Sequence, residues 1–165
     1  MIRTDGAARG NPGPASCGAV LIDADRPDAE DPDAAPLVAL ARPLGVRTNN
    51  VAEYTGVVLA LREARRRGAR DVQLVLDSNL IVEQLAGRWR VKDVKLQPLY
   101  REARTLLSGF ERWSVRHEPR SRNRAADALA NLALDDPAAA VRLERRYGVE
   151  REPAGSAQPT LFGEA

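Results

Sequence analysis

Four acidic residues lie at the ends of predicted strands or the beginnings of predicted helices, where folding could bring them together in one site. Asp5 follows a short apolar start, and Asp77 ends a longer apolar run. Glu53 and Asp127 each lie in the first turn of a predicted helix. Taken singly, such acids are explained as turn formers at strand exits or as charges that complement the positive end of a helix dipole. Gathered together they would repel one another unless cations neutralised them.

The chemistry of such a group is that of hard divalent cations. Carboxylate oxygens favour Mg²⁺ or Mn²⁺, and the single histidine and single cysteine of the chain cannot form a zinc cluster. Two divalent ions would balance four negative charges. Two such ions about 3.5–4 Å apart can activate a water and stabilise the leaving oxygen of an in-line phosphoryl displacement. The four acids therefore predict a two-metal phosphodiester hydrolase.

The elements that must position these acids alternate between strands and helices. Apolar runs predict strands at residues 2–5, 18–22, 37–44, 72–77 and 112–117. Helical spacing predicts helices at about 48–67, 78–85 and 96–107, and from about 123 onward, where Pro137 is expected to end or kink the last helix. The order predicts an α/β fold, in which a five-stranded mixed sheet of three antiparallel and then parallel strands is flanked by helices.

The first strand matters most, because it carries Asp5. A buried fourth strand parallel to the first would place Asp5 and Asp77 on one rim, where open sheets of this kind bind ligands. The first strand looks clipped, and residues 4–14 form a glycine-rich stretch. Gly6, Gly10 and Gly13 suit a turn that approaches a sugar-phosphate backbone closely, or simply a hairpin turn.

Length and composition limit the number of domains, the cellular compartment and the kinds of partner that the chain can have. A chain of 165 residues with one cysteine, Cys17, and no long apolar run fits one domain of a monomeric, cytoplasmic protein without a membrane segment. The net charge of +2 is too small to indicate a nucleic-acid partner by itself. An inference that the chain binds nucleic acid must therefore rest on local patches of positive charge. Residues 23–36 are rich in acids and proline and are expected to form an exposed, mobile loop. We expect a catalytic domain at 1–147 and a disordered tail at 148–165.

Residues 88–95 mix four positive charges with Trp89. Such a mixture is typical of a nucleic-acid contact surface, where bases stack on an aromatic ring. The same residues could form a solvated turn with Trp89 packed into the core. Sequence alone leaves both interpretations open.

Four blocks of sequence, taken together and in order, resemble type I ribonuclease H over about residues 1–135. The blocks are Thr4-Asp5-Gly6 through Gly10-Asn11-Pro12-Gly13-Pro14, Thr48-Asn49-Asn50-Val51-Ala52-Glu53, Leu76-Asp77-Ser78-Asn79, and His117-Glu118-Pro119-Arg120 through Asn123-Arg124-Ala125-Ala126-Asp127. The resemblance implies a ribonuclease H-like fold and endonucleolytic cleavage of the RNA strand of RNA–DNA hybrids, leaving 5′-phosphate and 3′-hydroxyl ends. It also implies that Asp5, Glu53, Asp77 and Asp127 bind two Mg²⁺ or Mn²⁺ ions.

The resemblance assigns further roles by position. His117 matches the family's mobile histidine, thought to assist at the scissile region or in product release, and Arg120 could give the same assistance. Thr48 resembles part of a pocket for a phosphate of the DNA strand. The remaining expected contacts with nucleic acid, several of them resembling readers of RNA 2′-hydroxyls, are Gly10, Asn11, Asn49, Asn50, Asn79, Trp89 and Lys92.

The chain also departs from the family pattern. Some relatives carry a long basic protrusion between the two central helices, whereas only residues 87–95 occupy that place here, so hybrid binding is expected to be weaker or more salt-sensitive. Asp93 stands where relatives often have an asparagine, which leaves cleavage of double-stranded RNA open. A non-catalytic hybrid-binding module and an exonuclease or transposase relative are alternatives. Gly6 disfavours the exonuclease, which usually presents an Asp-x-Glu pair at this place.

One signal lies in the tail. Residues 158–162 resemble the Gln-x-x-Leu-Phe peptide with which bacterial replication and repair proteins dock on the sliding clamp. Leu161 and Phe162 have no core to join in a polar tail, so a partner pocket would explain them. The expected clamp contacts are Gln158, Leu161 and Phe162.

Overall fold

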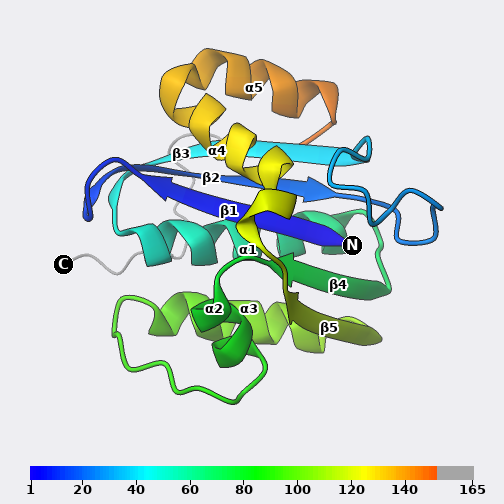
Figure 1. Ribbon diagram of the computed structural model, residues 1–165, viewed down its shortest axis with the longest axis horizontal. Helices are drawn as coiled ribbons and strands as arrows, with labels where there is room; N and C mark the ends of the chain where they lie inside the picture. The colour runs from blue at the N-terminus through cyan, green and yellow to red at the C-terminus, as the bar shows by residue number, and fades with distance from the viewer. Residues whose placement is uncertain (152–165) are drawn as a thin grey trace.

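A five-stranded mixed sheet forms the centre of the computed structural model, which describes residues 1–151 (Figure 1). The strand order is β3-β2-β1-β4-β5. β1 pairs with β2, and β2 with β3, in the antiparallel sense, whereas β1, β4 and β5 are parallel. The strands are β1 (Ile2–Ala8), β2 (Gly13–Leu21), β3 (Val38–Arg47), β4 (Asp71–Leu76) and β5 (Arg112–His117). The predicted architecture is confirmed.

Helices cover both faces of this sheet (Figure 1). The first three, α1 (Asn49–Arg66), α2 (Asn79–Leu85) and α3 (Gln97–Ser108), pack on one face in a single apolar cluster with β4. The last two, α4 (Arg124–Asp135) and α5 (Pro137–Arg146), cover the other face over β1, β2 and β3. None of the helices in residues 1–151 has the length and apolar character needed to cross a membrane.

The larger core lies between α1, α3 and the sheet. Tyr54, Leu61, Leu74 and Leu99 are fully buried there, and burying each such side chain stabilises the fold by about 1.5–3 kcal/mol. The hydroxyl of Tyr54 donates a hydrogen bond to Gln84 Oε1 at 2.6 Å, so this buried polar group is satisfied. This core fixes α1, the helix that carries Glu53, against β1.

The first strand is longer than predicted. β1 continues past Asp5 to Ala8, because its antiparallel ladder with β2 runs on to the pair Ala8 and Ala15. Its parallel ladder with β4 stops at Thr4 and Leu76. The strand is therefore not clipped, and the glycine-rich segment is mostly strand with a short turn. Asp5 stands where β1 loses one of its two neighbours.

Other element boundaries also differ from the predictions. β2 begins at Gly13 instead of Gly18, and β3 continues to Arg47. Of the two outcomes predicted for Pro137, an end or a kink of the helix, the structure shows the end: α4 stops at Asp135, and Pro137 begins α5. A proline loses no hydrogen bond there, because the first helical N–H groups have no partner within the helix. Asp136 caps this helix by accepting a hydrogen bond from Ala139 N at 2.9 Å.

The acidic segment 23–36 is exposed as predicted, but it is fastened to the domain. Ala29 is buried against Met1, Val20 and Val75, and arginines outside the segment bind it. Arg116 donates to Glu30 Oε2 at 2.7 Å, and Arg122 donates to the Glu30 carbonyl at 2.7 Å. The composition of the segment did not reveal these contacts, because the partners lie far away in the sequence.

Residues 148–151, which were predicted to belong to the disordered tail, contact the domain. Val149 is buried, and Arg151 donates a hydrogen bond to the buried carboxylate of Glu144 in α5. The same carboxylate accepts a hydrogen bond from Ala41 N on the edge strand β3 at 3.0 Å. Residues 148–151 therefore belong to the domain. Residues 152–165, which include the clamp-like peptide, lie outside the described part of the chain.

Two glycines allow helices to approach the sheet closely. A Cβ on Gly6 would lie 2.4 Å from Glu53 N in α1, and a Cβ on Gly18 would lie 2.3 Å from the Ala126 carbonyl in α4. Gly18 pairs with Asp5 across β1 and β2, so the Asp5 side chain lies on the sheet face where a Cβ on Gly18 would meet α4. These contacts bring Glu53 and Asp127 towards Asp5.

We expect Gly18→Ala to destabilise the protein by about 1–3 kcal/mol, because the added methyl group must push α4 away from β2. Chemical denaturation would measure this loss. Gly109→Ala is the matched control, since its Cβ would meet only the Leu106 carbonyl, at 3.3 Å. An equal loss in both variants would show that close helix approach does not explain Gly18.

Candidate active site

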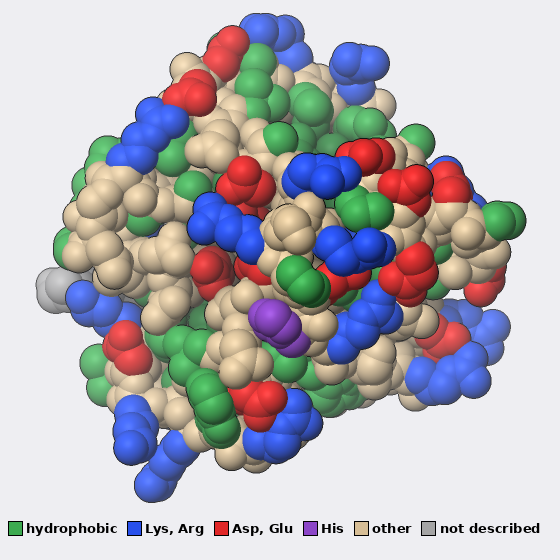
Figure 2. Space-filling model, in the orientation of Figure 1, with side chains coloured by type: hydrophobic (Ala, Val, Ile, Leu, Met, Phe, Trp, Pro, Cys, Tyr) green, Lys and Arg blue, Asp and Glu red, His purple; other side chains and the backbone are tan. Residues whose placement is uncertain are grey.

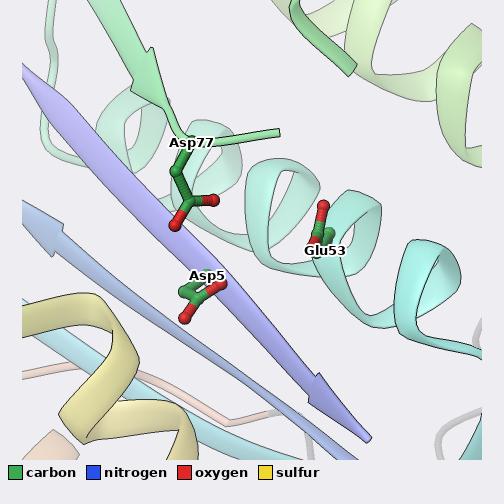
Figure 3. A group of neighbouring side chains, drawn as sticks. All are labelled: Asp5, Glu53 and Asp77. Carbon is green, nitrogen blue, oxygen red and sulfur yellow. The ribbon is translucent and has the colours of Figure 1, made fainter. Parts of the chain in front are cut away.

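Three carboxylates from three elements converge at the carboxyl end of β4 (Figure 3). Asp5 comes from β1, Glu53 from α1, and Asp77 follows the last residue of β4. One oxygen from each of the three lies within 4.8 Å of the others. The structure thus brings together three of the four predicted metal ligands in a group able to hold a cation.

Local structure places Glu53 on this rim. Thr48 caps α1 by accepting a hydrogen bond from Val51 N at 3.3 Å, as the sequence predicts. One turn later, Glu53 Oε1 accepts a hydrogen bond from Asn49 Nδ2 at 3.0 Å. Because Gly6 lets this turn lie directly on β1, the carboxylate is held beside Asp5.

Asp127 approaches from the opposite face. It lies in the first turn of α4, and its carboxylate is near enough to Asp5 to help raise the pKa of Asp5. It is outside the group of three, and Arg120 Nη2 lies 3.5 Å from its Oδ1. All four predicted acids are therefore neighbours, with Asp127 at the edge of the group.

Asn123 is a site residue that the sequence analysis passed over as a helix start. Its Nδ2 donates to the Thr4 carbonyl at 2.8 Å and to Asp77 Oδ2 at 3.3 Å. It is buried, so it ties β1 and Asp77 to the beginning of α4. Its position in the fourth sequence block was the available signal.

The electrostatics of the group favour a bound cation. Burial, followed by the charge of Asp77 and the nearby carboxylates of Asp127 and Glu53, raises the pKa of Asp5 to about 8. Burial also raises the pKa of Glu53, against the hydrogen bonds from Ser78 and Asn49. Asp5 Oδ1 accepts a hydrogen bond from Gly6 N, whereas its buried Oδ2 has no donor among the described residues. A buried acceptor without a donor, surrounded by other carboxylates, fits a hard divalent cation.

A cavity of about 220 Å³ opens onto these carboxylates. Its lining combines acids, amides and one arginine, all of which can contact a phosphodiester or a ribose. The lining residues are Asp5, Gly6, Asn49, Asn50, Glu53, Asp77, Ser78 and Arg120. The structure therefore brings Asn49, Asn50 and Arg120 to the same place as the acids.

His117 lies at the rim rather than in the cavity. It is the last residue of β5, it is exposed, and its Nε2 lies 3.2 Å from the Asp77 carbonyl oxygen. The face of the molecule in Figure 2 carries the single histidine on the surface among interspersed acidic and basic side chains.

The other predicted nucleic-acid contacts are spread over two regions. Asn11 lies beside the cavity, where its Oδ1 accepts a hydrogen bond from Asn49 N at 3.1 Å, and Gly10 next to it adopts a positive φ of 96°. Asn79 is exposed at the first residue of α2. Trp89 is 49% exposed, so the interpretation that packs it into the core is wrong. Lys92 is also exposed, in the connection between α2 and α3.

Comparison with known proteins places the chain in a family. A family model described as reverse transcriptase-like matches residues 3–133. The ribonuclease HI of Halobacterium salinarum is 46% identical over 133 residues, which are 80% of this chain and 62% of that protein. The ribonuclease H of Chromohalobacter salexigens is 36% identical over 158 residues, which cover 86% of this chain and 87% of that protein. The chain belongs to the ribonuclease HI family.

Solved structures agree with this membership. The crystal structure of RNase H1 from Halobacterium salinarum matches with a TM-score of 0.74 and 43% identity, covering 82% of this chain and 96% of that one. LC11-RNase H1, crystallised in complex with an RNA/DNA hybrid, matches with a TM-score of 0.73 and 33% identity, covering 82% and 96%. This member of the ribonuclease HI family thus has a ribonuclease H-like fold, and metal dependence is general to its family.

Some relatives are much longer. A bifunctional protein of Mycobacterium tuberculosis is 44% identical over 135 residues, which are 82% of this chain but only 35% of that protein. The chain therefore spans about a third of that relative and 62% of the Halobacterium enzyme. Because of this partial coverage, an activity of a whole relative can only be proposed for this member of the ribonuclease HI family.

The raised pKa of Asp5 predicts how the metal-free protein responds to pH. Between the ordinary value of 3.8 and about 8, the folded state keeps a proton that the unfolded state releases, so stability falls as pH rises through this window. Asp5→Asn cannot ionise, and in chelator at pH 8.5 we expect it to be more stable than the wild type by about 1–3 kcal/mol. Thermal unfolding at pH 5 and 8.5 would show the difference growing with pH.

Asp71→Asn is the control for this experiment. Asp71 is ion-paired with Arg112 at the far end of β4, and this partner holds the pKa of Asp71 below its ordinary value. The control should therefore gain no stability at pH 8.5. An Asp5→Asn variant that is less stable than the wild type at this pH would contradict the electrostatic account.

Proposed function

We propose that the chain is a divalent-metal-dependent endonuclease that hydrolyses the RNA strand of RNA–DNA hybrids and leaves 5′-phosphate and 3′-hydroxyl ends. The observation that carries this proposal is the convergence of Asp5, Glu53 and Asp77, with oxygens within 4.8 Å, in a cavity that is also lined by amides. The membership in the ribonuclease HI family supports the same reaction. A pure binding module would have no use for mutually repelling buried carboxylates.

The proposed metal ligands are Asp5, Glu53 and Asp77, with Asp127 beside Asp5, and the proposed cofactor is a pair of Mg²⁺ or Mn²⁺ ions. When bound, such ions supply Lewis-acid stabilisation of a phosphodiester and a more acidic water. The contribution of the chain is a rigid ligand set. Asn49 orients Glu53, and Asn123 orients Asp77, so neither carboxylate has to be reorganised when a cation binds.

Substrate contacts are proposed for the residues around the cavity. Asn49 and Asn50 line it, and Asn11 contacts Asn49, so these amides can bind the 2′-hydroxyl groups that separate RNA from DNA. Arg120 lines the same cavity and can pair with a phosphate in place of Asp127. His117, at the rim, can accept or donate a proton near neutral pH. The relative crystallised with an RNA/DNA hybrid supports a hybrid as the substrate.

The exposed Trp89 belongs to a second proposed contact surface. It lines a separate cavity of about 510 Å³ between α2 and α3, together with Arg88, Arg90 and Arg101. Arginines beside an exposed aromatic ring suit the backbone and bases of a nucleic-acid strand. Lys92 follows Val91 of this cavity lining and is a further proposed contact. Asn79, at the other end of α2 next to Ser78 of the active-site cavity, is also a proposed contact. The monomeric state and cytoplasmic location stay predictions.

Cleavage of a labelled RNA–DNA hybrid is the direct test of the proposed function. We expect cleavage of the RNA strand with Mg²⁺ or Mn²⁺ and none in chelator. Asp77→Asn should lower kcat by about 100-fold or more, because a lost metal ligand removes several kcal/mol of transition-state stabilisation. Asp71→Asn, six residues earlier at the first residue of β4 and outside the cavity, is the matched control and should retain activity.

Two results would contradict the proposal. Hybrid cleavage that persists in chelator or in Asp77→Asn would refute the metal assignment. Equal cleavage of double-stranded RNA and of hybrid would refute the hybrid specificity, which Asp93 already places in question.

The peptide at residues 158–162 is proposed to dock on a bacterial sliding clamp, and it lies outside the described residues. Replacing Leu161 and Phe162 with Ala should abolish retention of the protein on immobilised clamp, because the two apolar side chains would fill the partner's pocket. Hybrid hydrolysis in solution should be unchanged, since the substitutions are far in sequence from the four acids. Undiminished retention would exclude this peptide as the docking element.

A further inference from the structure

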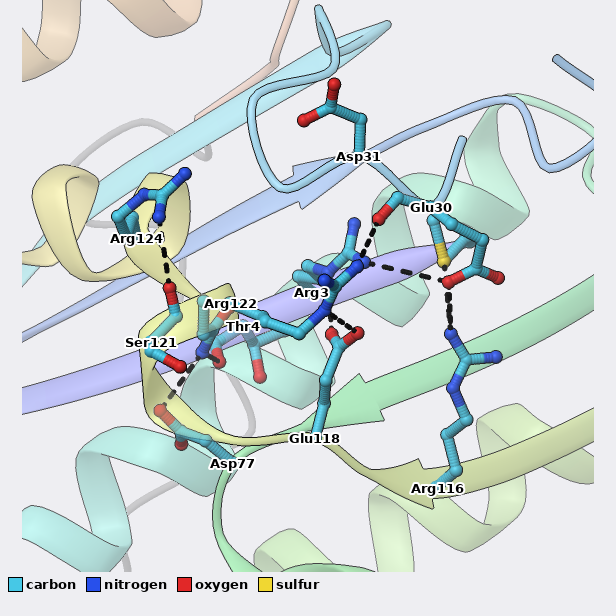
Figure 4. Close-up of polar contacts among 12 residues, drawn as sticks. Arg3, Thr4, Glu30, Asp31, Asp77, Arg116, Glu118, Ser121, Arg122 and Arg124 are labelled. Carbon is cyan, nitrogen blue, oxygen red and sulfur yellow. Dashed lines mark hydrogen bonds and ion pairs between the residues drawn. The ribbon is translucent and has the colours of Figure 1, made fainter. Parts of the chain in front are cut away.

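A buried arginine lies on β1 two residues before Asp5 (Figure 4). The side chain of Arg3 is 1% exposed, and its Nε donates a hydrogen bond to Glu118 Oε2 at 3.1 Å. Neither terminal nitrogen of Arg3 has a hydrogen-bond acceptor within residues 1–151, and its other acidic neighbour, Glu30, is 3.9 Å away. The contact with Glu118 is therefore what fixes this guanidinium in place.

Such an arrangement is costly unless the pair stays intact. A cation removed from water loses several kcal/mol of hydration, which only a well-placed partner can offset. The acidic segment helps to enclose the pair, since Glu30 binds Arg116 through its carboxylate and Arg122 through its backbone carbonyl, both at 2.7 Å. The buried charge of Arg3 is therefore stabilised by Glu118, and the same contact fixes the position of the Glu118 side chain.

Glu118 is fixed from three directions. Its second oxygen, Oε1, accepts a hydrogen bond from Arg122 Nε at 2.9 Å, and its backbone N–H donates to the Leu76 carbonyl at 2.9 Å. Burial opposes its ionisation, but the hydrogen bonds from Arg3 and Arg122 outweigh burial and hold the pKa of Glu118 below its ordinary value. The residue is 9% exposed, which leaves its side chain little room to move.

Glu118 stands between the two side chains proposed to assist catalysis. His117 precedes it with Nε2 at 3.2 Å from the Asp77 carbonyl, and Arg120 follows two residues later beside Asp127. His117 is exposed, and the side chain of Arg120 is 80% exposed, so neither is held by packing of its own. Within the described chain, the buried anchor of residues 117–120 is Glu118.

We propose that Arg3 and Glu118 are positioning residues whose buried ion pair holds residues 117–120, so that His117 and Arg120 face the carboxylates. The proposal deepens the proposed function and rests on it for the roles of His117 and Arg120. Neither Arg3 nor Glu118 lines the cavity, so both act through the segment they hold. A displacement of about 1 Å at a reacting group can lower a rate by up to about 100-fold, so such an anchor has a measurable effect on kcat.

The first test needs neither metal nor substrate. His117 is the only histidine of the chain, so the untagged full-length protein gives a single imidazole C2–H resonance in its proton NMR spectrum. We expect Arg3→Met and Glu118→Gln each to shift or broaden this resonance. Asp71→Asn is the matched control, because it breaks another arginine–carboxylate pair of the sheet, the one that joins β4 to β5 at the end far from His117. A resonance that moves no more than in this control would overturn the proposal.

Loss of folding is separated from loss of positioning by a double variant. Arg3→Met with Glu118→Met leaves no unpaired buried charge, and apolar replacement of a buried ion pair is often neutral or stabilising. We expect this variant to unfold at a temperature close to that of the wild type and yet to show the altered His117 resonance. A wild-type resonance in the folded double variant would overturn the proposal, whatever the single variants do.

The second test uses hybrid cleavage. Arg3→Met should lower kcat about tenfold and leave KM within about twofold, because the segment is misplaced while the hybrid surface is intact. In a protein that already carries His117→Ala and Arg120→Ala, the same substitution should lower kcat less than twofold, since residues acting through one another are not additive. A tenfold loss in both backgrounds would show a merely structural role and overturn the proposal.

Failure of the proposed function is distinguishable from failure of this inference. If the wild type cleaves no hybrid, the proposed function fails, and the NMR result still decides whether Arg3 and Glu118 hold residues 117–120.

Discussion

The mutual repulsion of carboxylates is the constraint around which this fold is organised. One oxygen each of Asp5, Glu53 and Asp77 lies within 4.8 Å of the others, and the burial of Asp5 and the neighbouring carboxylates raise the pKa of Asp5 to about 8. Nothing in the group itself favours such an arrangement without a cation. Its free energy must come from the apolar core between α1, α3 and the sheet, and from the helix contacts at Gly6 and Gly18. Stability elsewhere in the domain maintains a site that is unfavourable by itself.

Charge pairing distinguishes this site from the rest of the molecule. Around it, arginines and acids are matched, as in the pairs of Arg3 and Arg122 with Glu118 and of Arg124 with Asp33. Within residues 1–151, none of the three converging carboxylates forms an ion pair with the protein, and the nearest cation, Arg120, pairs with Asp127 instead. The net charge of +2 does not reveal this difference between the site and its surroundings, because it sums the paired charges and the unpaired carboxylates over the whole chain. The unpaired group is where a mobile cation is most strongly attracted.

The sequence predicts the elements well because their signals are local. The order of the elements along the chain, the capped start of α1 at Thr48 and the bounds of β5 follow from periodicity and cap residues within short windows. The four acids were found because they stand at the ends of these elements. The extension of β1 to Ala8 was missed, because pairing with β2 is a longer-range interaction that outweighs the turn signal of the glycines. The actual meeting of Asp5 with Glu53 depends on helix packing and cannot be read from spacing.

Arg3 shows most clearly what local signals omit. An arginine between isoleucine and threonine in a short strand predicts an exposed edge or a salt-bridged surface, and its partner Glu118 is 115 residues away. The same holds for the acidic segment, whose composition predicts a detached loop but whose Glu30 binds arginines from β5 and from the turn before α4. Both cases join charged residues that lie far apart in the sequence. The segment that carries His117 and Arg120 is therefore held by contacts that exist only in the folded chain, so its geometry is a property of the tertiary structure and not of the sequence block in which it lies.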